Sequence, residues 1–98
     1  MIVLISARAE QDLEEIGDYI ARDDPNRAIA YIRMLRAKCL ALADLPSRFP
    51  LVPRYEARGI RRRVHGDHLI FCRVEHEQVV ILHVLHGARD YAAFLFPV

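Results

Sequence analysis

The chain has 98 residues, 53% of them hydrophobic, and a net charge of only +1, so it can bury one compact core but not two. Its apolar runs are far shorter than the ~20 residues that a membrane-spanning helix needs, and its apolar start lacks the basic flank of a signal peptide. These features exclude membrane and multidomain classes and predict a single cytoplasmic domain over residues 1–98. Cys39 and Cys72 lie in apolar patterns and are expected to be reduced core thiols.

The small net charge hides an uneven distribution. Residues 1–47 hold six Lys/Arg and eight Asp/Glu, whereas residues 48–73 hold seven Arg and only two acidic residues. Such a local positive field favours an acidic polypeptide or a nucleic acid as partner. Every cation in the second stretch is Arg, whose planar guanidinium pairs with carboxylates and phosphates, so the bias suits recognition.

The first half of the chain predicts a strand followed by two helices. Met1 to Ile5 is an apolar, β-branched run, and Ser6 can cap the helix that follows. Apolar residues then recur with helical spacing at Ala9, Leu13, Ile16 and Ile20. The acidic residues of this helix are expected mostly on its other faces, at Glu10, Asp12, Glu14, Glu15 and Asp18. Asp24 and Pro25 suit the start of a second helix, predicted to run to about Ala43 as the partner in an antiparallel hairpin.

The second half predicts a loop and three strands. Three prolines mark Leu45–Gly59 as a loop, with room for a single helical turn. Strand-like runs follow at Ile60–His65, Leu69–Val74 and Val79–His86. Their short links predict antiparallel hairpins, and the last two runs are apolar enough to be central strands buried on both faces. The first strand is expected at the sheet edge or beside the last strand. The predicted fold class is α+β, an antiparallel helix hairpin packed on an antiparallel sheet in the order β-α-α-β-β-β.

The second half also resembles the ParE-type toxins of the RelE/ParE superfamily. The matching segments are Gly59, Arg61–Arg63, His68–Val74 and Val79–Asp90. The stretch from His86 to Asp90, after an apolar strand, is the most specific part, and the acidic first helix also fits. The resemblance implies the toxin of a type II toxin–antitoxin system of the plasmid-stabilisation kind. Its partner would be a ParD-like antitoxin that binds DNA with its N-terminal half and wraps the toxin with an acidic C-terminal tail, so that the toxin meets DNA only indirectly.

Within this superfamily, ParE-type toxins act on DNA gyrase and RelE-type toxins cut mRNA in the ribosome. RelE-like sequences usually place an Arg before the middle strand, an Arg after the last strand, and a Tyr or His near the C-terminus. Here His68 replaces the first, Arg89 matches the second, and the tail Phe94–Val98 has no titratable side chain. We therefore predict a gyrase inhibitor without catalytic chemistry. The alternatives are a ribosome-dependent mRNA endoribonuclease, or a non-toxic member of the family kept for its complex.

Two sets of candidate residues follow. If the chain is a nuclease, the acid, base and phosphate-binding groups are expected at His68, His86, Arg89 and Tyr91, although His86 and Arg89 also suit a purely structural role. Contacts with an acidic partner are predicted at Arg58, Arg61, Arg63, Arg73 and Arg89, with a solvated, charge-protected edge strand as the alternative. Strand alternation sends Arg62 to the face opposite Arg61 and Arg63.

No cofactor or metal site is predicted. His83 and His86 are three residues apart in a strand, so their side chains point to opposite faces and cannot chelate one ion. His65 and His68 flank a turn but lack further ligands beside them. The apolar tail Tyr91–Val98 is expected to fold back on the core or to form a partner contact.

Overall fold

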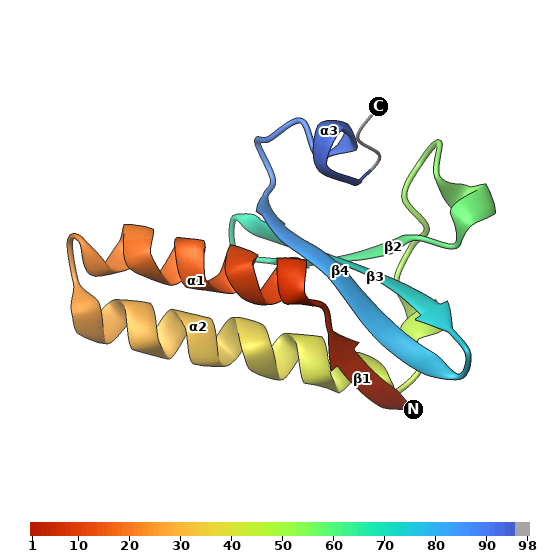
Figure 1. Cartoon of the computed structure of the whole chain (residues 1–98), viewed down its shortest axis with the longest axis horizontal. Helices are drawn as coiled ribbons and strands as arrows, with labels where there is room; N and C mark the ends of the chain where they lie inside the picture. The colour runs from red at the N-terminus through yellow and green to blue at the C-terminus, as the bar shows by residue number, and fades with distance from the viewer. Residues whose placement is uncertain (96–98) are drawn as a thin grey trace.

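A computed structural model describes residues 1–95 and has two layers, a helix hairpin and a four-stranded sheet (Figure 1). Strand β1 (Ile2–Ile5) leads into α1 (Ala7–Ala21), and α2 (Pro25–Leu40) returns beside it. The remaining elements are β2 (Arg61–His65), β3 (His68–Glu75), β4 (Gln78–His86) and the short helix α3 (Ala92–Leu95). No helix in this part of the chain is both long and apolar enough to cross a bilayer.

Both long helices begin where the sequence predicts. The Ser6 side chain accepts a hydrogen bond from the backbone N–H of Ala9 at 3.1 Å. The Asp24 carboxylate accepts one from the N–H of Arg27, also at 3.1 Å, and Pro25 occupies the first turn of α2. These caps satisfy donors that the first turn of a helix cannot pair internally.

The segment between the hairpin and the sheet is more tightly wound than predicted. Helix α2 ends at Leu40, and the next three residues, Ala41–Ala43, form a 3-10 turn, which is a common way to finish an α-helix. The predicted loop Leu45–Gly59 contains two further 3-10 turns, Pro46–Arg48 and Glu56–Arg58. The loop is therefore confirmed, with one more helical turn than expected.

The strands lie in the order β1-β4-β3-β2, so β3 and β4 are central as predicted. The prediction of antiparallel pairing is confirmed for β2, β3 and β4. It is wrong for β1, which runs parallel to β4, with Ile2 opposite Gln78 and Ile5 opposite Ile81. Apolar alternation decides which face of a strand is buried, but only a direct hairpin link fixes its direction, and no such link joins β1 to β4.

Apolar residues cover both faces of the central strands. On the helix side the buried cluster includes Leu13, Leu35, Cys39, Ile70, Cys72 and Ile81. Burial raises the pKa of both thiols to about 11, so they remain protonated core groups. On the other face, Tyr91, Phe94 and Leu95 pack on Val52, Ile60, Leu69, Phe71 and Leu85. The tail therefore folds back as far as Leu95, and Figure 1 shows α3 across the sheet from the hairpin. The last three residues of the predicted tail lie outside the described residues.

Helix α1 is attached directly to the edge of β4. Pairing between β1 and β4 stops at Ile5, and Ser6 continues it. The Ser6 N–H donates to the carbonyl of Ile81 at 3.1 Å, and the Ser6 hydroxyl donates to the carbonyl of Leu82 at 3.3 Å. Beyond the end of β1, hydrogen bonds from the start of α1 therefore continue the pairing along this edge of β4.

Asp12 extends this attachment nearly two helical turns further along α1. It was expected among the outward-facing carboxylates, but its side chain is buried. Its Oδ2 atom accepts a hydrogen bond from the backbone N–H of Val84 at 3.0 Å and lies 2.9 Å from Nδ1 of His83. A buried carboxylate is tolerated where donors surround it, and here they come from the edge of the sheet.

We expect Asp12→Ala to lower the free energy of unfolding by about 2 to 4 kcal/mol, because the N–H of Val84 and the ring of His83 would lose their partner while still buried. Urea denaturation monitored by circular dichroism measures the change. The control is Glu15→Ala, an exposed carboxylate on the same helix, which should change stability by less than about 0.5 kcal/mol. Equal effects of the two substitutions would contradict the role given to Asp12.

Candidate functional site

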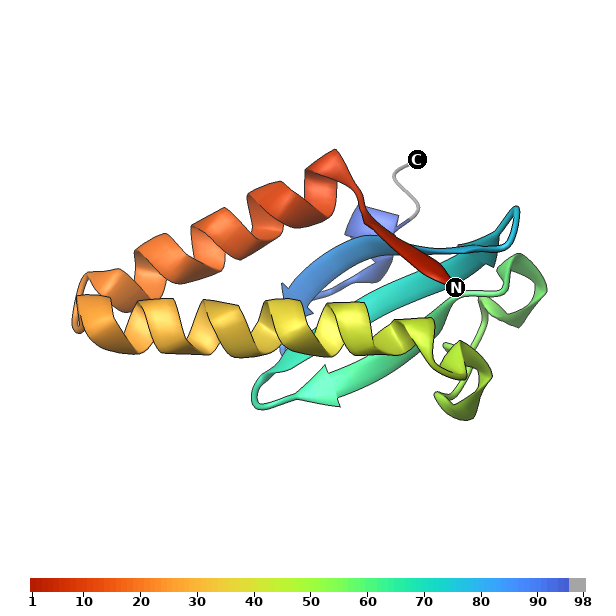
Figure 2. The same ribbon diagram turned by 90° about the horizontal axis from the view of Figure 1, so that it is seen from below.

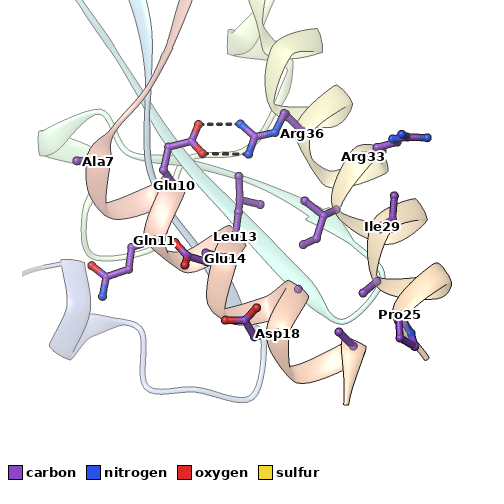
Figure 3. A pocket seen from close by; sticks show the side chains of 14 residues that line it. Ala7, Glu10, Gln11, Leu13, Glu14, Asp18, Pro25, Ile29, Arg33 and Arg36 are labelled. Atoms are coloured by element: carbon purple, nitrogen blue, oxygen red, sulfur yellow. Dashed lines mark hydrogen bonds and ion pairs between the residues drawn. The ribbon is translucent and has the colours of Figure 1, made fainter. Parts of the chain in front are cut away.

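Two hollows lie on the helix hairpin. The first, which we call the hairpin groove, runs between α1 and α2 on the side away from the sheet and has a volume of about 990 Å³ (Figure 3). Its apolar floor consists of Leu13, Gly17, Ala21, Ala28 and Ile32. The helices approach closely here, since a Cβ atom on Gly17 would lie 3.2 Å from Cγ1 of Ile32. Beside the floor, Ile29 is 53% exposed although it is apolar.

The sides of the hairpin groove carry opposite charges. The α1 side has Glu10, Glu14 and Asp18, one per turn, and the α2 side has Arg33 and Arg36. Arg36 donates two hydrogen bonds to the carboxylate of Glu10, at 2.7 and 3.0 Å, and Figure 3 shows the pair reaching across the groove. These hydrogen bonds lower the pKa of Glu10. The pair therefore bridges the groove near one end.

The second hollow, which we call the histidine pocket, has a volume of about 700 Å³ and lies between the hairpin and one end of the sheet. At its centre the hydroxyl of Tyr31 is 2.7 Å from Nδ1 of His68. The ring of His68 also meets that of His86 edge-on, with centroids 5.4 Å apart. Burial, and then the neighbouring His86, lower the pKa of His68, and burial raises the pKa of Tyr31.

The structure brings together three of the four candidate nuclease residues. His68, His86 and Arg89 all line the histidine pocket. Tyr91 lies elsewhere, on the opposite face of the sheet, where its ring packs on Phe71 with centroids 5.1 Å apart. Tyr91 is therefore absent from the histidine pocket, and Tyr31 of α2 lies there instead.

The charges around the histidine pocket are mainly negative. Carboxylates line it at Asp12, Glu15, Asp23 and Asp67, whereas the guanidiniums that line it are those of Arg27 and Arg89. One of these cations is partly engaged, because the Arg89 guanidinium lies 4.5 Å over the ring of Phe94. Asp12 is buried and hydrogen-bonded, which leaves three exposed carboxylates and two guanidiniums around the pocket. The pocket therefore does not offer the excess of cations with which a site for RNA cleavage binds phosphate.

The arginines predicted to contact a partner do not form one patch. Arg61 and Arg63 lie on the helix side of β2 and donate to backbone carbonyls of the same chain, those of Ser47 and Phe49 for Arg61 and that of Lys38 for Arg63. Arg73 instead pairs with Glu75 at 2.7 Å. The two remaining members are Arg58, exposed in a 3-10 turn, and Arg89 in the histidine pocket.

Two residues of these sites were missed from the sequence, and the same signal marks both. Asp12 is three residues after Ala9 and four before Ile16, so it falls on the apolar face of α1. Tyr31 falls between Ala28 and Leu35 in the same way on α2. A polar group within an apolar helical face should find a partner across the interface, and both do.

Comparison with solved structures finds a similar fold in two toxin–antitoxin systems. A structure of the chromosomal ParDE TA system from P. aeruginosa matches with a TM-score of 0.73 and 20% identity, covering 88% of this chain and 95% of the other. The toxin–antitoxin complex RelBE2 from Mycobacterium tuberculosis matches with a TM-score of 0.59 and 24% identity, covering 90% and 92%. At these identities the likeness concerns the fold alone.

A family model identifies the chain more narrowly. The model of the ParE toxin of type II toxin-antitoxin system, parDE, matches residues 3–91, which is nearly the whole sequence. The chain therefore belongs to the ParE toxin family. A comparison with curated proteins finds no match.

The histidine pocket predicts a pH-dependent stability. Because the pKa of His68 is lowered from its ordinary value of 6.5, the unfolded chain takes up a proton at a higher pH than the folded one. Stability should thus be fully present above pH 6.5 and fall as the pH drops toward the folded pKa. Denaturation between about pH 7.5 and 5.5 measures this slope. His68→Asn, which keeps a polar group near Tyr31, should flatten the slope, whereas His76→Asn in an exposed turn should not. An unchanged slope in the first variant would refute the assignment.

Proposed function

We propose that this ParE-family toxin inhibits DNA gyrase by binding it, in the cytoplasm, without chemistry of its own. One observation carries the proposal. The pocket that gathers the histidines is lined by more carboxylates than guanidiniums, so it is poorly suited to hold an RNA phosphate in a cleavage reaction. The residue expected to supply an acid–base group near the C-terminus, Tyr91, packs into the apolar layer on the other face instead.

A second candidate function rests on the contact between Tyr31, His68 and His86. A half-buried imidazole with a lowered pKa is neutral at pH 7 and can accept a proton, which is what a ribonuclease requires of its base. Mapping transcript ends after the toxin is induced in cells separates the two functions. Intact transcripts are expected from gyrase inhibition, and cleaved transcripts from an mRNA endoribonuclease.

Purified toxin in molar excess should block the supercoiling of relaxed plasmid by gyrase. The variant His68→Asn/His86→Asn should inhibit as strongly as the wild type, because binding needs no acid or base. Relaxation by topoisomerase I is the matched control and should be unaffected. Full supercoiling at excess toxin would reject the proposal, and loss of toxicity in the double histidine variant would favour the nuclease.

For neutralisation we propose a ParD-like antitoxin whose C-terminal helix lies in the hairpin groove. Leu13 and Ala28 at the floor of the groove are buried between the helices, but Gly17, Ala21 and Ile32 are partly exposed there, and Ile29 is 53% exposed at its side. Partner helices commonly anchor apolar residues in such grooves. The DNA-binding half of the same antitoxin would remain outside the groove.

Ile29→Glu should weaken the complex with the antitoxin by about 2 kcal/mol or more, because it places a charge against the apolar anchors of the partner. The thermal unfolding of the free toxin should change little, since Ile29 is more than half exposed. Titration calorimetry against the cognate antitoxin measures the affinity. Met34→Glu, at a residue 48% exposed outside the groove lining, is the matched control and should leave the affinity unchanged.

A further inference from the structure

In the hairpin groove the acidic residues lie on α1 and the basic residues lie on α2. Glu14 and Asp18 line it from α1, and Arg33 lines it from α2 (Figure 3). Glu10 and Arg36 form the one ion pair that joins the two sides within residues 1–95. Over the same residues no ion pair engages Glu14, Asp18 or Arg33, so their charges remain available to a partner.

From this arrangement we infer that the groove selects one kind of helix, with an apolar stripe flanked by basic residues toward α1 and acidic residues toward α2. The inference rests on the proposed antitoxin site and specifies the chemistry of its occupant. It differs from what the Arg-rich second half predicts, which is a partner with an acidic C-terminal tail. Such a partner would meet Glu14 and Asp18 with like charge.

The apolar floor of the groove suits about two turns of helix, while the lining on α1 continues past Glu10 to Ala7. Its floor on α1 runs from Leu13 to Ala21, about 12 Å at the helical rise of 1.5 Å per residue. Anchors at positions i, i+3 or i+4, and i+7 cover that length with one apolar stripe. Glu14 and Asp18 are four residues apart, so two basic residues with the same spacing on the partner can face both.

Opposite charges on the two sides also fix the direction of the bound helix. When a helix in a groove is reversed, its left and right flanks exchange sides. A helix with one basic and one acidic flank therefore meets Asp18 and Arg33 favourably in only one of the two directions. The Glu10–Arg36 pair at one end of the groove makes the ends unequal as well. The groove thus sets both the charge pattern and the polarity of the chain that it binds.

Three fluorescein-labelled helical peptides with an identical apolar stripe test the inference. One has a Lys flank and a Glu flank, one has two Glu flanks, and one has two Lys flanks. Fluorescence anisotropy with the full-length toxin at low salt should show the mixed peptide binding about tenfold more tightly than either other peptide. The variant Glu14→Lys/Asp18→Lys should instead prefer the peptide with two Glu flanks. Arg33→Glu should prefer the peptide with two Lys flanks.

Two variants with the same charge changes outside the groove serve as controls. Glu15→Lys/Asp23→Lys and Arg8→Glu should keep the preference for the mixed peptide, because these residues do not line the groove. Equal affinity for all three peptides, or a wild-type preference for the acidic one, would overturn the inference, as would the absence of any binding. The supercoiling assay and the titration with antitoxin are independent of these peptides. If the peptides show no charge preference but the supercoiling and antitoxin experiments succeed, the charge selection is refuted and the proposed function is not.

Discussion

The carboxylate of Asp12 at the edge of β4 is the contact on which the position of the hairpin depends. Strand β1 pairs with only the first part of β4, and beyond it Ser6 and Asp12 hydrogen-bond to the backbone of Leu82 and Val84. Because these bonds are directional, they fix the helix along the strand more closely than apolar packing alone. Figure 2 shows the consequence, a hairpin held at one end over the sheet while its turn projects beyond it.

Because of this attachment, two different sides of α1 line the two hollows. Its side away from the sheet forms the acidic wall of the hairpin groove, and its other side contributes carboxylates to the histidine pocket. The proposed antitoxin therefore binds where the hairpin is furthest from the sheet, and the histidines remain accessible on the opposite side of the same helix. Helix α2 also lines both hollows, so a partner in the groove would affect the histidine pocket through movement of either helix.

Local signals in the sequence predicted the elements and their order. Ser6, Asp24 and Pro25 marked the helix starts, because capping is decided by a few neighbouring residues. Features that depend on residues far apart in the sequence could not be predicted from such local signals. The parallel direction of β1 depends on where the finished hairpin places the strand, and the burial of Asp12 depends on an edge 72 residues away. Of the candidate site, the meeting of His68 with His86 follows from strand pairing, whereas the displacement of Tyr91 follows from its packing against Phe71.

The parallel pairing of β1 with β4 also has a consequence for synthesis. Ile5 pairs with Ile81, so the first strand to be synthesised has to wait for β4, the last of the four strands, before it can pair. Contacts of such long sequence separation form late, because the chain between them has to be ordered first. A ribosome making this protein therefore releases helices and apolar strands well before the sheet can close. During that interval the apolar faces that the hairpin and the sheet bury against each other in the finished protein remain exposed.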